Sequence, residues 1–210
     1  MGTAFPSILR GKDTAVDVLF QDDNLHQFYR NGLGFRETNR SLVSFVAALT
    51  DRAPNARVLE IGAGTGATTE AVLAASSCAH YTFSDVSSAF FGPAKEKLRR
   101  YENKTSFTPF DIECEPSTQG LQTGSFDIVI ASNVLHATSD VQMVLRHVRS
   151  LIRPGGYLVC AELAPGYLLR NTIIMGGLPG WWLEHGKDRF WLSALSDDQW
   201  DVYLLSLIHI

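Results

Sequence analysis

Val58-Leu59-Glu60-Ile61-Gly62-Ala63-Gly64-Thr65-Gly66 is the stretch of sequence that decides the fold. Its first half is apolar apart from Glu60 and predicts a buried strand, and its glycines predict a turn that opens a helix. Glycine permits positive φ and has no Cβ, so backbone amides can approach a ligand closely. The start of the following helix adds unpaired N–H groups and a partial positive charge. This combination indicates a site for a nucleotide-like cofactor.

Short apolar runs alternate with helical patterns along the rest of the chain. We expect strands at 57–61, 80–84, 106–109, 126–131 and 156–162, and helices near 67–76, 89–101 and 139–152. The helix at 139–152 is the clearest, because Ser139 can cap it and Pro154-Gly155-Gly156 can end it. The alternation predicts an α/β fold with a mostly parallel sheet between two helical layers, a Rossmann-like three-layer sandwich.

The two ends of the chain differ from this pattern. We expect residues 1–55 to form an N-terminal helical lid or cap, with a helix that begins after a cap at Thr38 or Asn39. Residues 56–166 are expected to be the cofactor-binding core, and the Gly-, Pro- and Trp-rich segment 167–192 a substrate lid. Ser196 begins a Ser-x-x-Gln capping box, so 193–210 should add a helix. Because no further strand follows, we expect a core truncated at its C-terminal end.

Composition narrows the classes of protein. The chain has 210 residues, 45% of them apolar, and a net charge of −4 without a basic run, which argues against a nucleic-acid partner. The three cysteines lack C-x-x-C spacing and the histidines lack ligand spacing, so we expect reduced, mostly buried thiols and no metal. No apolar run approaches the roughly 18 residues of a membrane span, and the N-terminus has no leader pattern. We therefore expect a cytoplasmic protein without membrane contact.

The glycine turn does not choose the cofactor by itself. Gly62-x-Gly64-x-x-Ala67 also satisfies the dinucleotide fingerprint, which leaves a nicotinamide oxidoreductase open. Asp85, at the end of the second expected strand, fits an acceptor for ribose hydroxyls in either case. Glu60 inside the glycine motif, Phe110-Asp111-Ile112 after the third strand and the run 126–136 at the fourth discriminate between the two. Together they resemble the class I S-adenosylmethionine-dependent methyltransferases.

A narrower resemblance rests on three motifs in order. They are Leu59 to Thr69, Asn133-Val134-Leu135-His136-Ala137, and Gly177-Leu178-Pro179-Gly180-Trp181-Trp182-Leu183. Over roughly residues 20–200 they resemble the C-methyltransferase domains of fungal highly reducing polyketide synthases, enzymes of secondary metabolism. The resemblance implies S-adenosylmethionine as cofactor, and as partners an acyl carrier protein with a phosphopantetheine-bound β-ketoacyl chain and other synthase domains. A stand-alone O- or N-methyltransferase of small molecules is the alternative.

The same resemblance assigns roles to individual residues. It implies a cofactor site made of Glu60, Gly62, Gly64, Gly66, Asp85, Asp111, Ile112 and Asn133. Glu60 and the glycines would hold the methionine end, Asp85 the ribose hydroxyls, and Asp111 the adenine amine, with Ile112 against the ring. Asp85 and Asp111 also fit a simpler role as turn or cap residues.

The resemblance also implies a catalytic pair. His136, after the fourth strand, would remove the α-proton of the acyl chain, and Glu162, at the end of the fifth, would orient the imidazole. Neighbouring parallel strands bring their carboxyl ends together, which is what such a pair needs. A histidine at a strand end is also often part of the core, and Glu162 also fits an ordinary surface position.

Overall fold

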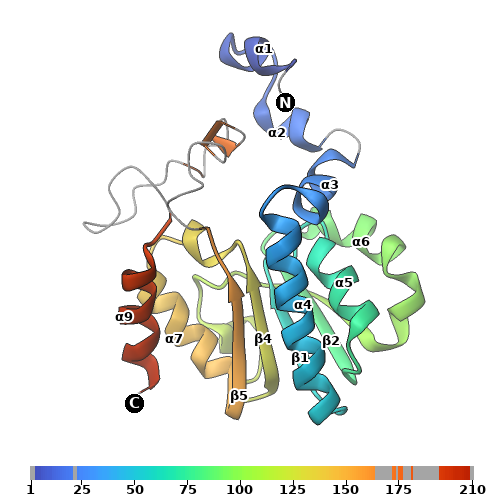
Figure 1. The fold of residues 1–210 in the computed structure, drawn as a ribbon, viewed down its shortest axis with the longest axis vertical. Coiled ribbons are helices and arrows are strands. Elements are labelled where there is room, and N and C mark those ends of the chain that lie inside the picture. The colour runs from blue at the N-terminus through green and yellow to red at the C-terminus, as the bar shows by residue number, and fades with distance from the viewer. Residues whose placement is uncertain are drawn as a thin grey trace.

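A central parallel sheet organises the molecule. The computed structural model describes residues 3–20, 23–163, 172–173, 175–176, 181 and 194–208. Its strands are β1 (Arg57–Ile61), β2 (His80–Asp85), β3 (Thr105–Pro109), β4 (Phe126–Ser132) and β5 (Ile152–Ala161). They lie in the order β3-β2-β1-β4-β5, and each neighbouring pair is parallel (Figure 1). The predicted α/β fold with a mostly parallel sheet is therefore confirmed.

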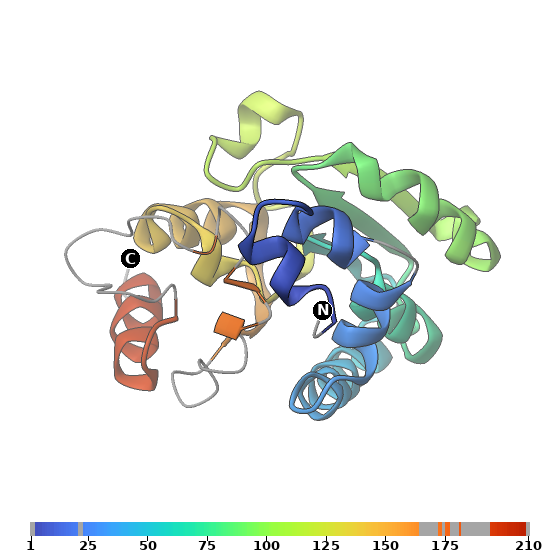
Figure 2. The same ribbon diagram turned by 90° about the horizontal axis from the view of Figure 1, so that it is seen from above.

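Helices cover both faces of the sheet. The α-helices are α1 (Phe5–Leu9), α2 (Ala15–Phe20), α3 (Asn24–Asn31), α4 (Phe35–Arg52), α5 (Ala67–Ala75), α6 (Phe91–Lys97), α7 (Val141–Leu151) and α9 (Asp197–Ile208). Short 3₁₀ turns are η1 (Ser88–Phe90), η2 (Arg99–Lys104), η3 (Pro116–Gln119) and η4 (Leu135–Ala137). Seen from above, α4, α5 and α6 lie on one side of the sheet and α7 and α9 on the other (Figure 2). Helices α1 to α3 stand beyond the carboxyl ends of the strands (Figure 1).

Each face of the sheet has its own apolar core. Val58 of β1 points toward α4 and α5, whereas the next residue, Leu59, points toward α7. The buried side chains of α7 pack in the same core as Leu59, and they are Val141, Val144, Leu145, Val148 and Leu151. Because both faces are covered, β1 and β4 are largely apolar and were predictable from short apolar runs, whereas the inner strand β2 buries Thr82, Ser84 and Asp85 beside Tyr81 and Phe83.

Several predicted boundaries were wrong, and tertiary contacts explain why. Helix α4 begins at Phe35 after Gly34, so Thr38 and Asn39 lie inside the helix instead of capping it. Helix α7 is capped by Asp140, whose carboxylate accepts the amide of Met143 at 2.9 Å. Ser139, the predicted cap, instead donates its hydroxyl to Glu113. Several neighbouring polar residues in the sequence could each cap the helix, and the contacts of the preceding loop decide which of them does.

Strand β5 and helix α9 test the C-terminal predictions. Strand β5 begins at Ile152, earlier than residue 156, and Ile152 pairs with Phe126 before a register irregularity. Pro154 can lie in this strand because β5 is the outer strand of the described sheet, where one side of the backbone needs no partner. The capping box of α9 is confirmed, since Ser196 and Gln199 exchange hydrogen bonds between side chain and backbone.

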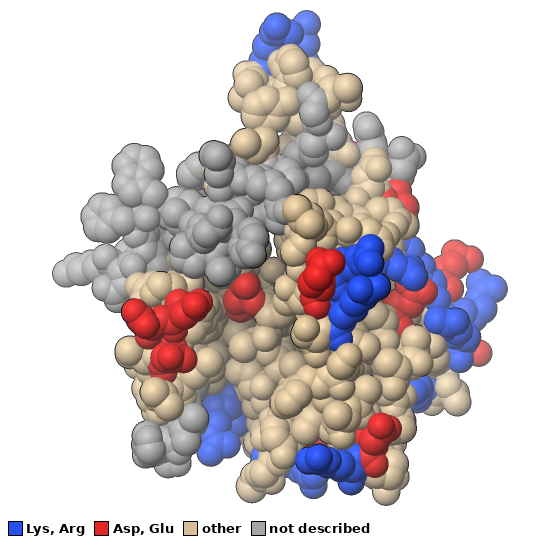
Figure 3. All heavy atoms as spheres, in the orientation of Figure 1, with Lys and Arg blue, Asp and Glu red and all other residues tan. Residues whose placement is uncertain are grey.

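The surface and the thiols add further observations. On the face seen in Figure 3, acidic side chains gather over α9, and side chains of both charges surround α4. The described residues on this face therefore form no continuous basic band.

All three cysteines are free, but only Cys78 is buried, so the expected burial of the thiols was wrong for Cys114 and Cys160. Among the described residues, no helix is long and apolar enough to cross a bilayer. Within the same ranges, no three potential metal ligands of the His, Cys, Asp or Glu type gather.

Candidate active site

A cavity opens at the carboxyl ends of the strands, where β1 and β4 lie side by side and the strand order reverses. Open parallel sheets bind ligands at this kind of position. The cavity has a volume of about 260 Å³. The described residues that line it are Leu25, Tyr29, Asn39, Glu60, Gly62, Ala63, Gly64, Thr65, Ala67, Thr68, Asp85, Phe90, Ser132, Asn133 and Met175. Five residues of the predicted cofactor site are therefore on its wall, namely Glu60, Gly62, Gly64, Asp85 and Asn133.

The glycine turn that joins β1 to α5 forms the floor of the cavity. Gly62 has a φ of 60°, and a Cβ added to it would lie 2.5 Å from Cγ2 of Val134. A larger residue is therefore excluded both by backbone strain and by contact with the loop after β4. The amide of Gly64 donates to Oδ2 of Asp85 at 2.9 Å, which fixes the turn against the end of β2.

Asp85 is a buried carboxylate at the end of β2 that lies on the cavity wall. Its Oδ1 accepts the amide of Ser87 at 2.8 Å, and its Oδ2 accepts the amide of Gly64. The turn-forming role is therefore real, because the carboxylate does organise its own loop. Each oxygen can accept more than one hydrogen bond, so the same group can also accept hydroxyls of a ligand.

Glu60 lies deeper, with only 2% of its surface exposed. Its Oε2 accepts the hydroxyl of Tyr81 at 2.6 Å and that of Thr69. Burial nonetheless dominates and raises the pKa of Glu60 to about 7, because a charged carboxylate loses its hydration there; the nearby charge of Asp85 adds to the shift. Glu60 therefore titrates near neutral pH instead of near 4.5.

This shift predicts that stability depends on pH through Glu60. Because its folded pKa is raised, the folded chain binds more protons than the unfolded chain between about pH 4.5 and 7. The free energy of unfolding should therefore fall as pH rises through this window, by about 3 kcal/mol from this group, and then level off. Urea unfolding of the ligand-free protein across the window measures the slope. The Glu60→Gln variant should lose most of that decline, and an unchanged slope in the variant would contradict the assignment.

Asn133 follows β4 and has a φ of 57°, a left-handed conformation that asparagine tolerates better than most residues. Its amide donates to the carbonyl of Ala161 at 2.7 Å, so β4 and β5 hold this turn between them. The side chain lies on the cavity wall. The backbone conformation thus places a polar amide group beside the glycine turn.

His136 and Glu162 meet beside this turn, as the parallel neighbours β4 and β5 led us to expect. Nδ1 of His136 lies 2.5 Å from Oε2 of Glu162, and both side chains are almost fully buried. Oε1 of Glu162 also accepts the amides of Val134 and Leu135 at 3.1 and 2.8 Å. The carboxylate is therefore anchored by the start of η4 and fixes the orientation of the imidazole. Neither side chain is among the described residues that line the 260 Å³ cavity, although Val134 links the pair to Gly62.

Three residues of the predicted cofactor site lie off the described cavity wall. Gly66 is the N-cap of α5, and Ile112 is packed in the core beneath α7. Asp111 forms a local turn, because its Oδ1 accepts the amide of Glu113 at 2.9 Å. The contact of Asp111 and Ile112 with adenine remains a prediction.

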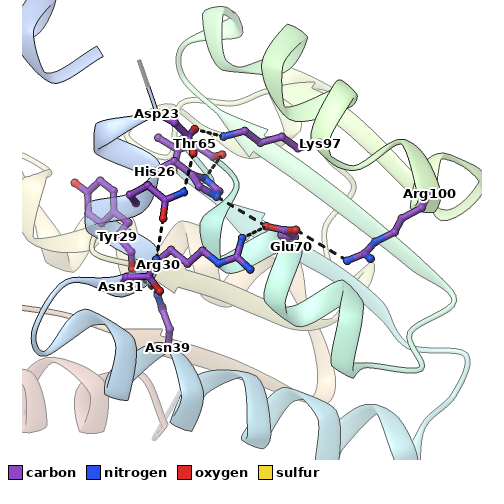
Figure 4. A network of polar contacts seen from close by, with 11 residues as sticks. Asp23, His26, Tyr29, Arg30, Asn31, Asn39, Thr65, Glu70, Lys97 and Arg100 are labelled. Atoms are coloured by element: carbon purple, nitrogen blue, oxygen red, sulfur yellow. Dashed lines mark hydrogen bonds and ion pairs between the residues drawn. The ribbon is translucent and has the colours of Figure 1, made fainter. Parts of the chain in front are cut away.

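Some cavity residues carry no recognisable signal in the sequence. The side-chain amide of Asn39 in α4 donates to the carbonyl of Tyr29 at 2.9 Å (Figure 4). Its side-chain oxygen accepts a hydrogen bond from the hydroxyl of Thr68 at 3.3 Å. It reaches the cavity only because α4 packs against α3 and α5. Leu25 and Tyr29 of α3 also line the cavity, and burial raises the pKa of Tyr29 to about 12; a lid formed by residues 1–55 remains a prediction. Most of the predicted substrate lid at 167–192 lies outside the described residues; Met175 lies on the wall and Trp181 is buried near it.

The chain is similar to methyltransferases of known sequence and structure. Residues 59–158 match a family model described as a methyltransferase domain. The chain is 46% identical to the reducing polyketide synthase Preu2 of Preussia isomera over 96% of its own length, which is 9% of that synthase. Among solved structures, the CurJ carbon methyltransferase superposes with a TM-score of 0.88 at 32% identity over 97% of this chain. The trans-methyltransferase CalH, solved as a complex with SAH, superposes with a TM-score of 0.82 at 33% identity over 98%. The chain spans 56% and 57% of these two structures.

Proposed function

Because this chain belongs to the S-adenosylmethionine-dependent methyltransferases and is similar to domains of polyketide synthases, we propose that it methylates the α-carbon of a β-ketoacyl chain. The chain would be carried as a thioester on the phosphopantetheine arm of an acyl carrier protein. Its setting would be a cytoplasmic polyketide synthase, whose other domains are the remaining partners. The observation that supports this proposal most is the buried His136–Glu162 pair next to the cavity, because removal of a proton from carbon requires a positioned base.

The groups around the cavity fit S-adenosylmethionine by chemical type. The Asp85 carboxylate suits the two ribose hydroxyls, and the glycine turn with Glu60 and Asn133 offers amides and a carboxyl group to the amino-acid end. We retain Asp111 and Ile112 as the groups that would meet adenine. When bound, the cofactor supplies an electrophilic methyl group on its sulfonium sulfur.

The role of the chain itself is to prepare the acceptor carbon. With Nδ1 of His136 held by Glu162, the proton of the acceptor would pass to Nε2 of the same ring. The C–H bond of the α-carbon breaks, and its electron pair moves toward the neighbouring carbonyls, which leaves a nucleophilic carbon. Glu162 stabilises the imidazolium that results. General-base assistance of this kind typically contributes about 10²- to 10⁴-fold in rate.

Incubation with methyl-labelled S-adenosylmethionine and a β-ketoacyl thioester mimic tests the proposal. The expected product carries the label on the α-carbon. Label found only on oxygen or nitrogen acceptors would contradict it and favour a small-molecule O- or N-methyltransferase. Thermal stabilisation by a nicotinamide dinucleotide but not by S-adenosylhomocysteine would instead favour an oxidoreductase, since a ligand of the native state raises the melting temperature.

A further inference from the structure

The glycine turn is held from two sides. On the sheet side, the amide of Gly64 donates to Asp85. On the opposite side, Nδ1 of His26 in α3 lies 3.1 Å from the carbonyl oxygen of Thr65, across a sequence separation of 39 residues (Figure 4). His26 is only 3% exposed and is the buried residue of α3, whose Leu25, Phe28 and Tyr29 pack against Met175 and Trp181. The proposed base and cofactor ligands make no use of it.

A carboxylate on α5 faces the other edge of this imidazole. Oε2 of Glu70 lies 3.9 Å from Nε2 of His26 and 2.9 Å from a guanidinium nitrogen of Arg30 (Figure 4). Its Oε1 lies 4.0 Å from Arg100. The ring therefore stands between a carbonyl at Nδ1 and a carboxylate at Nε2. The tautomer with its proton only on Nε2 would turn a lone pair toward the Thr65 carbonyl, so the geometry requires a proton on Nδ1.

The contact with Thr65 fixes one particular peptide group. The amide that follows the Thr65 carbonyl is that of Gly66, which donates to the carbonyl of Ala63 at 2.9 Å. Both ends of the 65–66 peptide are thus hydrogen-bonded, its oxygen to α3 and its N–H within the turn. Gly64 and Gly66 have φ values of 53° and 77°, and glycine has few barriers to rotation. Without an external contact, this peptide would have to be ordered when a ligand binds, which costs affinity.

We propose that His26 and Glu70 are positioning residues that preorganise the glycine turn for the cofactor. His26 holds the Thr65 carbonyl, and Glu70 faces the other edge of the ring at 3.9 Å and pairs with Arg30 of the same helix, which keeps α3 against α5. The inference rests on the proposed function, because it takes the cavity above this turn as the site of S-adenosylmethionine. It assigns the pair to cofactor affinity and not to proton transfer, since His26 contacts the glycine turn, whereas the proposed base His136 contacts Glu162 at the ends of β4 and β5.

A simpler role would be to tether α3, whose Leu25 and Tyr29 line the cavity. The chain offers a matched control for that role, because Asp23, the N-cap residue of α3, makes a 2.7 Å ion pair with Lys97 of α6. This pair ties the same helix to the core without contact to the turn. A loss of affinity that came only from a loosened α3 would be shared by the His26 and Asp23 variants.

The experiment compares four variants of the full chain. His26→Phe keeps a flat ring without an N–H, and His26→Asn keeps a donor near the position of Nδ1. The other two variants are Glu70→Gln and the control Asp23→Asn. Calorimetry gives the dissociation constant of S-adenosylhomocysteine, and initial rates give kcat and the KM of S-adenosylmethionine. His26→Phe should raise the dissociation constant and KM by about tenfold, the equivalent of one hydrogen bond. Glu70→Gln should raise them less, His26→Asn should recover part of the loss, and Asp23→Asn should change neither. At saturating cofactor, kcat should stay at its original value in all four variants.

The outcomes separate this inference from the proposed function. If the unaltered chain binds no S-adenosylhomocysteine, the proposed function fails and the cofactor role of His26 fails with it. If the unaltered chain binds but His26→Phe and Glu70→Gln bind equally well, only the inference is overturned. Equal losses in the His26 and Asp23 variants, or a fall in kcat with KM unchanged, also overturn it. If His26→Phe does not fold, Glu70→Gln still tests the inference, because it exchanges one polar side chain for another on the other side of the His26 ring.

Discussion

Replacing His136 with alanine should reduce methyl transfer by about 10²- to 10⁴-fold, the usual contribution of a general base. The dissociation constant of S-adenosylhomocysteine should stay unchanged, because His136 is not among the described residues of the cavity wall. Single-turnover rates with a β-ketoacyl thioester, together with calorimetry, measure the two quantities. Glu162→Gln should lower the rate less, since the amide can still accept from η4 but does not stabilise an imidazolium.

Exchange of the α-proton provides a more direct readout of the base. With S-adenosylhomocysteine in place of the methyl donor, the unaltered protein should accelerate deuterium exchange at the α-carbon of the acceptor, and His136→Ala should not. His80→Ala is the matched control, because His80 starts β2 at the opposite end of the sheet and contacts Ser106. Undiminished exchange in the His136 variant would place the base elsewhere.

Replacing Asp85 with alanine should have the largest effect on cofactor binding. The variant loses the proposed acceptor for ribose hydroxyls, and it leaves the amides of Gly64 and Ser87 without their partner. Hydrogen bonds to a charged group contribute about 1.5–3 kcal/mol each, so we expect the dissociation constant of S-adenosylhomocysteine to rise roughly 100-fold or more. Calorimetry below the melting temperature measures it.

Asp127 provides the control for this experiment. It is also a largely buried carboxylate that accepts a backbone amide, that of Arg57 at 2.8 Å, and it pairs with Arg153 at 2.5 Å, but at the amino end of β1. Asp127→Ala should lower the melting temperature and leave the affinity for S-adenosylhomocysteine intact. A similar loss of affinity in both variants would mean that Asp85 acts through stability alone.

The parts of the fold that the sequence predicts well are those that local patterns dictate. The strand at 57–61 and the turn after it follow from apolar runs and glycines, and Ser196 with Gln199 forms the predicted cap. Helix starts were harder, because Ser139 and Asp140 are both good caps and only the contact of Ser139 with Glu113 leaves Asp140 for the helix. The sequence shows both candidate caps, but it does not show the loop contact that decides between them.

The site divides along the same line. Residues that stand at strand ends, such as Asp85, Asn133 and His136, could be placed from topology alone. Asn39 and His26 could not, because each reaches the glycine turn region from a helix distant in sequence, at separations of 29 residues from Thr68 and 39 from Thr65. Such contacts depend on how α3 and α4 pack, which no periodicity encodes.

The left-handed backbone at Asn133 has a consequence for engineering. Glycine adopts a φ of 57° without the steric strain of a Cβ, and this gain offsets the entropy that glycine adds to the unfolded chain, so a screen that rewards heat resistance alone would not reject Asn133→Gly. The same exchange removes the side-chain amide of a residue that lines the cavity. Variants selected only for stability at high temperature should therefore include ones with lower activity through this position. Engineering for thermostability has to select for turnover as well.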